Sequence, residues 1–314
     1  MTTLPKITDI DVTNKKVLLR LDLDTKPDPN DLRVKSSFET LDYLKDKASE
    51  IIILAHRGRP DGKFDESLSL KSFQPIFDKW GARVEENLRF DKREMEYSED
   101  FAKELASMGD VYINDSFAES HRNAVSIVGI PKYLPHAVGL RFVKEVENLS
   151  KVFEPVRPLV ILISGIKKDK LEMIEPLSNL ADKVLVGGRL PDFLGDNTIS
   201  VRSQDGKVIV GNLTMDKEDI TVNTIEKFKE EILKAKTIVL AGVLGKYEDE
   251  GHSQGTKSVF DAVGDASAIF KIVGGGDSLA AITRYNLTDK FDWISVGGGA
   301  MLEYLTKKTL PGIE

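Results

Sequence analysis

Basic side chains recur through the first half of the chain, next to short apolar runs and turns. They are Arg33, His56, Arg57, Arg59, Arg89, His121 and Arg122. An arginine can hold a phosphate or a carboxylate through two parallel hydrogen bonds, so several arginines in one cleft would suit a small, doubly charged anion. Asp22 and Asp24, in the stretch RLDLD, would accept hydrogen bonds from substrate hydroxyls or orient the arginines. Metal binding by His56 or His121 is the weaker alternative, because neither histidine has a partner at ligand spacing.

Glycine-rich turns mark the second half of the chain, and each follows an apolar, strand-like run. They are SGIKKDK (164–170), VGGR (186–189), AGVLGKYE (241–248), VGGGDS (273–278) and VGGGAM (296–301). Backbone N–H groups in such a loop can approach a phosphate closely, aided by the N-terminus of the helix that follows. A single loop of this kind is often only a tight strand-to-helix turn. Several of them at one end of a sheet predict a nucleotide site.

Asp277 directly follows three glycines, where its carboxylate can reach a Mg²⁺ ion on bound phosphates. The alternative is that Asp277 only caps the N-terminus of the helix expected over 278–285. The chain contains neither a G-x-x-x-x-G-K-[ST] loop nor a G-x-G-x-x-G turn. The usual ATPase and dinucleotide-binding loops are therefore disfavoured.

Short apolar runs alternate with helical patterns along the chain. We expect strands over 17–21, 51–54, 111–113, 159–164, 184–186, 237–240, 269–273 and 293–296, and helices over 34–45, 98–106, 170–180, 224–233 and 256–263. This alternation, with strands that are apolar throughout, predicts an α/β fold whose parallel strands are covered on both faces. Such strands could form one barrel or two open sheets, but a barrel would have more even spacing. We therefore predict two doubly wound, Rossmann-like parallel sheets.

A mostly polar helix over 141–153, ended by Pro155 and Pro158, interrupts this pattern at mid-chain. A polar helix stopped by prolines is typical of a connector between domains. We expect an N-terminal domain over 1–150 and a C-terminal domain over 156–304, joined by a helical hinge. We also allow for the tail at about 305–314 to pack back on the first domain. A hairpin with an Asp205–Gly206 turn is expected within the second domain.

Composition narrows the function classes. The 314 residues include no cysteine, which excludes disulfides and thiolate metal sites. The net charge of −7 argues against nucleic acid as the main partner. The first residues lack the layout of a signal peptide and the apolar runs are too short to span a bilayer, so we expect a cytoplasmic protein without a membrane partner. One half of the chain then suits a small anionic substrate and the other half a nucleotide, as in a two-domain kinase.

Several longer motifs resemble those of the phosphoglycerate kinase family. They are HRGRP (56–60), ENLRF (86–90), DVYINDSF with the later HR (110–122), VGGGDS (273–278), SVGGGAMLEYL (295–305) and LPGI (310–313), in the family's order. The resemblance covers nearly the whole chain and implies reversible, Mg²⁺-dependent phosphoryl transfer. In that reaction 1,3-bisphosphoglycerate and ADP give 3-phosphoglycerate and ATP, in glycolysis or gluconeogenesis. It also implies a monomer that works by hinge closure. The alternative is a non-catalytic relative that only binds nucleotide or phosphoglycerate.

The same resemblance implies roles for individual residues of the first domain. Those that would hold 3-phosphoglycerate are Asp22, Asp24, Arg33, His56, Arg59, Arg89 and Arg122. Arg33 would also face the phosphoryl group during transfer and is therefore a candidate catalytic residue.

In the second domain the resemblance implies a nucleotide site with ATP or ADP and Mg²⁺. Its residues would be Lys167, Gly187, Gly188, Gly242, Glu248, Gly274, Gly275, Gly276, Asp277 and Ser278. Glu248 would bind the ribose and Asp277 the Mg²⁺ ion. Lys170 and the backbone N–H groups of Gly276 and Gly299 would stabilise the phosphoryl group in transfer. The loop over 164–170 is one residue shorter than in the family, so the roles of Lys167 and Lys170 could be exchanged.

The chain also departs from the family pattern in several places. It is shorter, and a strand and a helix are missing between 77–84 and 86–90. After 187–193 the expected hairpin replaces a helical segment. Ala241 and Val243 stand where the family carries an asparagine and a proline, which leaves the nucleotide preference open.

Overall fold

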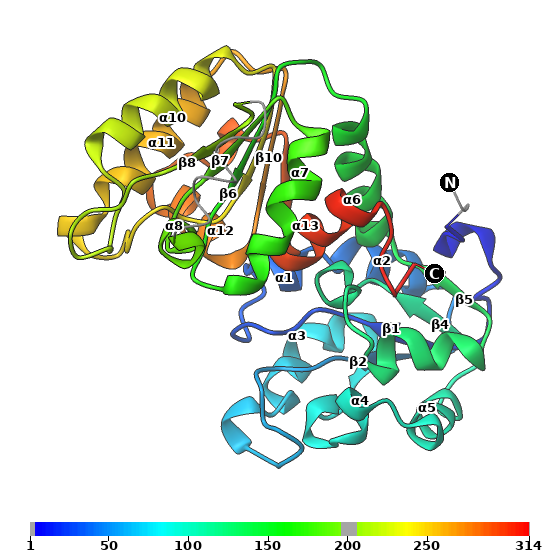
Figure 1. The fold of residues 1–314 in the computed structure, drawn as a ribbon. Helices are drawn as coiled ribbons and strands as arrows, with labels where there is room; N and C mark the ends of the chain where they lie inside the picture. Colours follow the sequence, from blue (N-terminus) through cyan, green and yellow to red (C-terminus); the bar gives the residue numbers. More distant parts are fainter. Residues whose placement is uncertain (1–3, 196–205, 314) are drawn as a thin grey trace. The chain divides into compact units, whose positions relative to one another are not determined.

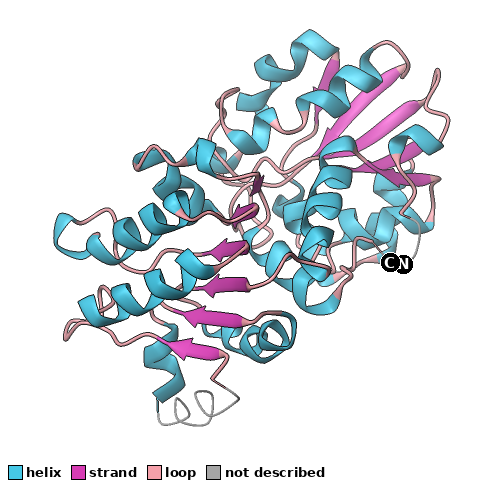
Figure 2. Ribbon diagram, turned by 90° about the horizontal axis from the view of Figure 1, so that it is seen from above, coloured by secondary structure: helices cyan, strands magenta, loops and turns pink. Residues whose placement is uncertain are grey.

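The computed structural model describes residues 4–195 and 206–313, and the chain divides into two compact units. The first unit comprises residues 1–147 together with 309–314, and the second comprises residues 148–308. Each unit is a parallel sheet with helices on both faces (Figures 1 and 2).

The first unit contains a five-stranded sheet in the order β3-β2-β1-β4-β5. The strands are β1 (Lys16–Arg20), β2 (Glu50–Leu54), β3 (Ala82–Val84), β4 (Val111–Asn114) and β5 (His136–Val138). The helices are α1 (Leu32–Lys35), α2 (Phe38–Lys45), α3 (Gln74–Phe77), α4 (Arg93–Glu96), α5 (Glu99–Ala106) and α6 (Leu140–Ser150), the last of which continues into the second unit. Leu19 and Ile53 pack into one hydrophobic cluster, while their neighbours Leu18 and Ile52 pack into another. Both faces of the sheet are therefore buried, which explains why its central strands are apolar throughout.

The second unit contains a six-stranded parallel sheet in the order β11-β10-β9-β6-β7-β8. Its strands are β6 (Leu159–Ile163), β7 (Lys183–Val186), β8 (Val208–Val210), β9 (Thr237–Ala241), β10 (Phe270–Gly274) and β11 (Trp293–Ser295). Its helices are α7 (Ile174–Leu180), α8 (Leu190–Leu194), α10 (Val222–Lys234), α11 (Gln254–Asp265), α12 (Gly276–Arg284) and α13 (Gly298–Lys307).

Each sheet reverses its winding direction once. In the first unit the chain runs from β1 through β2 to β3 on one side, and β4 then returns to the other side of β1. In the second unit β9 returns beside β6 in the same way. Loops that leave neighbouring strands in opposite directions open a crevice at the carboxyl edge, and ligands of open α/β sheets bind there. The fold therefore places one candidate site between β1 and β4, and another between β6 and β9.

The fold prediction is confirmed, since the structure has two open parallel sheets and every predicted strand is present. The strands that the sequence did not predict are β3 and β5. Each has three residues and lies at an edge of its sheet, so only one side is paired and the apolar signal is short. The first arm of the expected hairpin around Asp205 lies outside the described residues. Its second arm is β8, which pairs in parallel with β7.

The predicted helices need smaller corrections. The helix expected over 34–45 is divided into α1 and α2, and the one expected over 170–180 begins with a 3-10 helix at Lys168–Met173. The polar helix at mid-chain is present as α6 followed by a 3-10 turn at Lys151–Phe153. Within the described residues no helix is both long and apolar enough to cross a membrane.

Candidate active site

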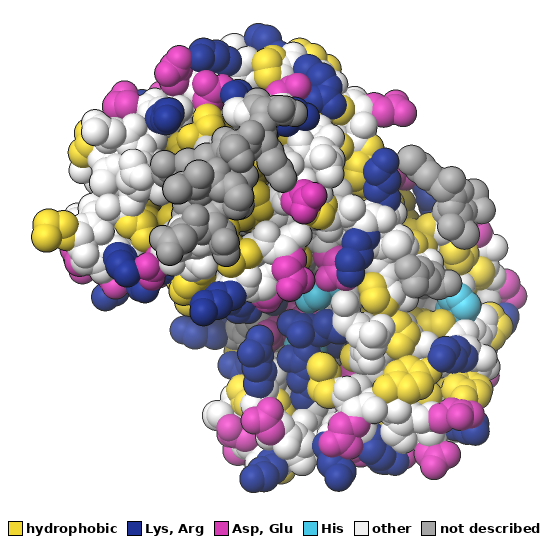
Figure 3. Space-filling view, in the orientation of Figure 1, with side chains coloured by type: hydrophobic (Ala, Val, Ile, Leu, Met, Phe, Trp, Pro, Cys, Tyr) yellow, Lys and Arg dark blue, Asp and Glu magenta, His cyan; other side chains and the backbone are white. Residues whose placement is uncertain are grey.

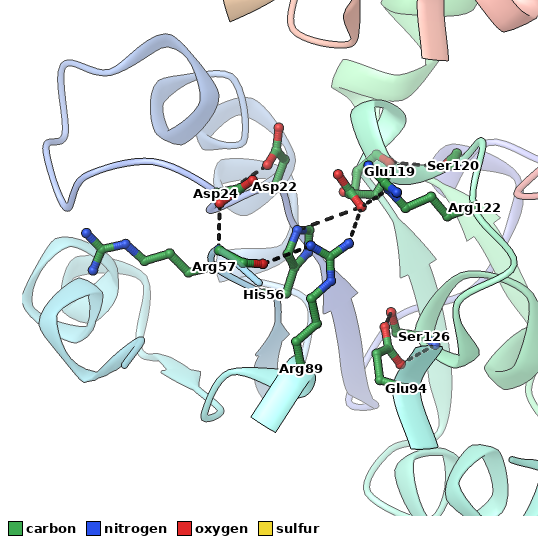
Figure 4. A network of polar contacts seen from close by, with 12 residues as sticks. Asp22, Asp24, His56, Arg57, Arg89, Glu94, Glu119, Ser120, Arg122 and Ser126 are labelled. Carbon is green, nitrogen blue, oxygen red and sulfur yellow. Dashed lines mark hydrogen bonds and ion pairs between the residues drawn. The ribbon is translucent and has the colours of Figure 1, made fainter. Parts of the chain in front are cut away.

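Charged side chains of the first unit meet at the carboxyl edge of its sheet, beside the junction of β1 and β4 (Figure 4). Asp22 and Asp24 follow β1, and His56 follows β2. Arg89 lies in the turn after β3, and Glu119 lies in the turn after β4. The parallel order of the strands therefore collects residues that are far apart in the sequence. Lys and Arg side chains also gather on the surface of this unit (Figure 3).

Asp22 orients Arg33. The Arg33 Nη1 atom lies 3.2 Å from each carboxylate oxygen of Asp22, and it donates to the backbone oxygen of Asp24 at 3.3 Å. Asp24 in turn accepts a hydrogen bond of 2.7 Å from the backbone N–H of Gly58. Burial raises the pKa of the Asp22 carboxyl, and the positive charge of Arg33 counteracts this shift. Of the two roles expected for Asp22 and Asp24, these contacts support the orienting one.

His56 is held in one tautomer by a buried arginine. Its side chain is 1% exposed, and its Nδ1 atom lies 2.9 Å from Nη2 of Arg20. Because a guanidinium can only donate, Nδ1 is the acceptor and a neutral ring carries its proton on Nε2. Burial, with the charges of Arg20 and Arg89, keeps the pKa of His56 well below 6.5. His56 is therefore a neutral hydrogen-bond donor at Nε2, and this atom has no hydrogen-bond partner within the described residues.

Arg89 and Arg122 share a carboxylate that the sequence reading did not single out. Nη2 of Arg89 donates to Oε2 of Glu119 at 3.0 Å, and Nε of Arg122 forms an ion pair with the same oxygen at 2.8 Å. Nη1 of Arg89 donates to the backbone oxygen of Gly58 at 3.0 Å. Figure 4 shows Glu119 between the two arginines and His56. Two of the predicted substrate arginines, Arg89 and Arg122, therefore converge on a carboxylate of the protein, whereas Arg33 pairs with Asp22.

Arg20 also belongs to a second buried chain of hydrogen bonds, with Ser126 and Glu94. Nε of Arg20 donates to Oγ of Ser126 at 2.9 Å, and this hydroxyl donates to Oε1 of Glu94 at 2.5 Å. The backbone N–H of Ser126 donates to Oε2 of Glu94 at 3.0 Å. All three side chains are almost fully buried. Sequence reasoning missed all three, although Arg20 within the apolar run KVLLRL was a signal, because a buried arginine needs a buried partner.

Two of the predicted basic residues lie apart from this cluster. Arg57 points away from the other labelled side chains in Figure 4, and its Nη1 donates to the backbone oxygen of Ser67 at 3.1 Å. Arg59 is exposed and makes no hydrogen bond or ion pair with the part of the chain that the structure describes.

The glycine loops of the second unit all leave the carboxyl ends of strands, as the sequence indicated. Gly242 follows β9 with φ +119°, and an added Cβ there would lie 2.2 Å from the backbone oxygen of Ser164. Gly275 follows β10 with φ +103°, and a Cβ added to Gly298 would lie 2.6 Å from the Cα atom of Gly275. Two pairs of loops therefore pack backbone against backbone, which leaves main-chain N–H groups at the edge of the sheet.

Lys170 and Lys167 differ in their surroundings. Nζ of Lys170 donates to the backbone oxygen of Ser164 at 2.5 Å, and burial lowers the pKa of this half-buried lysine. Asp277 is close enough for its negative charge to act in the opposite direction on that pKa. Lys167 is exposed. Lys170 therefore lies against the residue that follows β6, whereas the side chain of Lys167 is exposed.

Asp277 lies in the first turn of α12 and is exposed. The N-cap residue of this helix is Gly275, so the alternative in which Asp277 merely caps the helix is wrong. The neighbouring Ser278 is buried, and its Oγ accepts a hydrogen bond of 2.9 Å from the N–H of Gly242. An exposed carboxylate is the kind of oxygen ligand that Mg²⁺ prefers, so Asp277, beside the backbone N–H groups of the glycine loop, fits a metal ion bound to phosphates.

The remaining predicted nucleotide residues occupy the same edge. Gly187 and Gly188 follow β7, and a Cβ on Gly187 would lie 2.1 Å from Cδ2 of Leu244. Glu248 is exposed in the loop after β9. Gly299 is exposed in the first turn of α13, where backbone N–H groups are not used by the helix itself.

Taken together, the first unit offers a buried set of arginines and a neutral histidine, and the second offers backbone N–H groups with a lysine and a carboxylate. These features describe an α/β protein of two units, with a candidate anion site in the first unit and a candidate nucleotide site in the second. The model of the phosphoglycerate kinase family matches residues 7–85, 79–203 and 192–308. The chain is 33% identical to phosphoglycerate kinase of Dictyoglomus turgidum, over 99% of this chain and 98% of that protein. It is 32% identical to phosphoglycerate kinase of Finegoldia magna, over 98% of this chain and 97% of that protein.

Solved structures lead to the same family. The structure of phosphoglycerate kinase from Coxiella burnetii matches with a TM-score of 0.81 and 28% identity, over 99% of this chain and 98% of that one. The enzyme of Pyrococcus horikoshii matches with a TM-score of 0.81 and 25% identity, over 98% and 97%. The chain therefore belongs to the phosphoglycerate kinase family.

The match also shows where the chain is shortened. The alignment with the Dictyoglomus protein runs over 388 residues, more than the 314 of this chain, so the relative carries internal segments that this chain lacks. The family match is broken into three pieces that meet at 79–85 and at 192–203. They coincide with two of the regions in which the sequence departs from the family pattern, the one before 86–90 and the one after 187–193.

Proposed function

We propose that this protein transfers a phosphoryl group reversibly between 1,3-bisphosphoglycerate and ADP, with a carboxyl group as the acceptor in the reverse direction. One observation carries the proposal. The cluster of Arg89, Arg122 and Glu119 and the glycine loops after β6 and β9 each lie at the carboxyl edge of a sheet, where its winding direction reverses. One edge suits a small organic anion and the other a nucleotide. We also propose that α6, which belongs to both units, is the hinge.

We assign 3-phosphoglycerate to the first unit. The proposed contacts are Asp22, Asp24, Arg33, His56, Arg59, Arg89 and Arg122. The neutral His56 supports this assignment, because a donor without a positive charge can orient a carboxylate or hydroxyl without binding every anion equally. Asp22 keeps Arg33 extended toward the site, which preorganises its guanidinium for the phosphoryl group.

We assign the nucleotide to the second unit. The proposed contacts are Lys167, Gly187, Gly188, Gly242, Glu248, Gly274, Gly275, Gly276, Asp277 and Ser278. Their support is the tight packing of the glycine loops, which leaves no room for side chains where phosphates would lie. Asp277 would hold Mg²⁺, which neutralises charge on the phosphates when it is bound.

The chemistry needs positioning and positive charge rather than a base. A carboxylate oxygen of 3-phosphoglycerate attacks the γ-phosphorus of ATP, and the bond to the bridging oxygen breaks so that ADP leaves with its electron pair. The carboxylate is already ionised at pH 7, so no side chain has to remove a proton. Lys170 and the N–H groups of Gly276 and Gly299 would stabilise charge on the phosphoryl oxygens. Partial burial of Lys170 strengthens such an interaction, because less water screens it.

The test is the initial rate of ADP formation from ATP and 3-phosphoglycerate, with and without Mg²⁺, while a coupling enzyme removes the acyl phosphate. We expect Mg²⁺-dependent turnover, and a loss of roughly 10²- to 10³-fold in kcat for Lys170→Met, since such a contact acts mainly in the transition state. The matched control is Lys168→Met, which removes a neighbouring exposed lysine that lies over the ring of Phe193. Its kcat should stay close to that of the unaltered protein.

Two outcomes would contradict the proposal. Nucleotide binding without turnover would favour the non-catalytic relative, whose specific support is the altered loop at Ala241 and Val243. Full turnover in Lys170→Met would show that this lysine does not serve the transition state and would move the role to Lys167.

A further inference from the structure

A single carboxylate oxygen is the meeting point of the donors in the first unit. Oε2 of Glu119 lies 2.8 Å from Nε of Arg122, 3.0 Å from Nη2 of Arg89 and 3.7 Å from Nε2 of His56. The side chains of Glu119 and Arg89 are each 9% exposed, and that of His56 is 1% exposed. Two guanidinium groups and one neutral imidazole donor thus surround one anionic oxygen (Figure 4).

The backbone around Glu119 is firmly anchored. Glu119 ends the short 3-10 helix Phe117–Glu119 directly beyond β4, and its N–H donates to the backbone oxygen of Ser116 at 3.2 Å. The next residue, Ser120, accepts from Nδ2 of Asn114 at 2.9 Å and donates to the backbone oxygen of Ser116 at 2.9 Å. The loop that carries Glu119 is therefore held in place independently of the contacts of its carboxylate with the arginines.

The donors that Glu119 engages are the ones that an anionic substrate would need. Nη1 of Arg89 is already bonded to the backbone oxygen of Gly58, so Nη2 is the end that faces the site. Arg33 is likewise paired with Asp22. Two carboxylates thus offset part of the positive charge of these three arginines, and a phosphate or carboxylate must either displace Glu119 or bind against a like charge.

We propose that Glu119 weakens substrate binding by competing with the anionic group of the substrate for Arg89 and Arg122. The proposal rests on the function assigned above, and it deepens that function by naming what weakens substrate binding. In the free protein Glu119 occupies the anion position. In the complex the substrate takes over both arginines, and the Glu119 side chain turns away from them. The cost of this exchange lowers the affinity for 3-phosphoglycerate without acting on the transition state.

The first experiment compares the unaltered protein with Glu119→Gln. Glutamine keeps the shape and can still accept from Arg89, but it removes the competing charge. We expect the KM for 3-phosphoglycerate to fall by about tenfold or more, with kcat changed by less than about threefold. The Kd for 3-phosphoglycerate and for sulfate, measured by calorimetry without any turnover, should fall in parallel. A merely structural role for Glu119 would predict the opposite, because damage to the site weakens binding.

The matched control is Glu99→Gln, which removes the same charge from an exposed helix position, where Glu99 pairs with Lys103 and Tyr133. Its KM and Kd values should equal those of the unaltered protein. If Glu119→Gln is folded by its melting temperature and its affinity for both anions is unchanged or weaker, the proposal is wrong. Because calorimetry does not depend on catalysis, a protein that binds anions but lacks kinase activity would refute the proposed function alone.

A second measurement does not depend on a variant. A crystal structure of the unaltered protein with 3-phosphoglycerate should show a substrate oxygen in place of Oε2, within hydrogen-bond distance of Arg89 and Arg122. The Glu119 side chain should point elsewhere. A bound substrate that leaves the carboxylate on both arginines would overturn the proposal.

Discussion

The two candidate sites occupy equivalent places in two similar sheets, yet they are built from different materials. The site of the first unit consists of side chains, and its charges are buried and mutually paired, as with Arg33 and Asp22. The site of the second unit consists mostly of backbone, exposed where glycines such as Gly242 and Gly275 allow loops to touch. The difference suits the two ligands. A small hydroxy acid needs directional side-chain donors, whereas a chain of phosphates needs many closely spaced donors, which backbone N–H groups provide.

The comparison also implies that different kinds of substitution should destabilise the two units. In the first unit, removal of one charged partner leaves the other buried and unpaired, which is expensive. In the second unit, the vulnerable change is the addition of a single carbon atom where two loops meet. Exposed charges and glycines with open surroundings should lose less stability on the same substitutions, and they supply controls for both units.

The largest effect is expected at Gly242. Replacement by alanine would place Cβ 2.2 Å from the backbone oxygen of Ser164 at φ +119°. We expect the unfolding free energy to fall by about 4 kcal/mol or more, because both strain and a clash with backbone have to be relieved. Gly81→Ala is the control, since Gly81 also has a positive φ, +63°, but nothing within 4 Å of its added Cβ. That variant should lose only about 1–2 kcal/mol in denaturant unfolding. Equal losses would mean that the loop contact in the second unit is not tight.

Glu94→Gln should have the next largest effect. The two carboxylate oxygens of Glu94 accept from the backbone N–H and the hydroxyl of Ser126, and the amide group of glutamine would oppose one of these donors. We expect a loss of about 3 kcal/mol in the unfolding free energy.

The control for this variant is Glu104→Gln in the same unit. Glu104 forms an ion pair of 3.0 Å with Arg93, but its side chain is 59% exposed. Its loss should cost no more than about 1 kcal/mol. If the two variants lost equal amounts of unfolding free energy, the hydrogen-bond network around Arg20 would contribute little to the stability of the first unit.

Much of this architecture could be predicted from the sequence. Continuous apolar runs such as 159–163 reveal strands that are buried on both faces, and glycines placed directly after them reveal the edge at which ligands bind. The motif around Asp277 was interpretable because few residue types fit a loop with that backbone. The edge strand β5, by contrast, has only three residues and one paired side, so it gives almost no periodic signal.

The buried network of the first site could not be predicted in the same way. Glu94 and Ser126 lie 32 positions apart, and their contact depends on how the helices fold over the sheet. Glu119 sits beside a recognisable motif, but a lone glutamate in a turn is usually solvated, and only the structure places it on Arg89 and Arg122. Glycine loops, whose backbone would bind a ligand, can be recognised from their residue types. Side chains such as Glu119, whose place depends on contacts with distant residues, can be recognised only in the folded structure.

The smallest predicted effect concerns the charge state of His56. Its pKa in the folded protein lies well below 6.5, the ordinary value that applies to the unfolded chain. At a pH between the folded and the unfolded pKa, the unfolded chain therefore binds a proton at this position and the folded protein does not. Stability from this residue is therefore fully present above pH 6.5 and is lost as the pH falls below it, by at most about 1.4 kcal/mol per pH unit. Asp115, with a pKa raised to about 6, contributes the opposite slope between pH 3.8 and 6. For this reason the measurement is the difference between the unaltered protein and His56→Gln in denaturant unfolding from pH 5 to 8.

The difference should be constant above pH 6.5 and should shrink below it, because glutamine has no proton to gain. His136→Gln is the control, since His136 is exposed and its Nδ1 lies 3.1 Å from the backbone oxygen of Leu134. Its stability should follow the unaltered protein at every pH. A constant difference across the whole range for His56→Gln would mean that His56 titrates normally in the folded protein. In that case Arg20 would not hold it neutral, and the first site would present a cation at this position below pH 6.5 rather than a neutral donor.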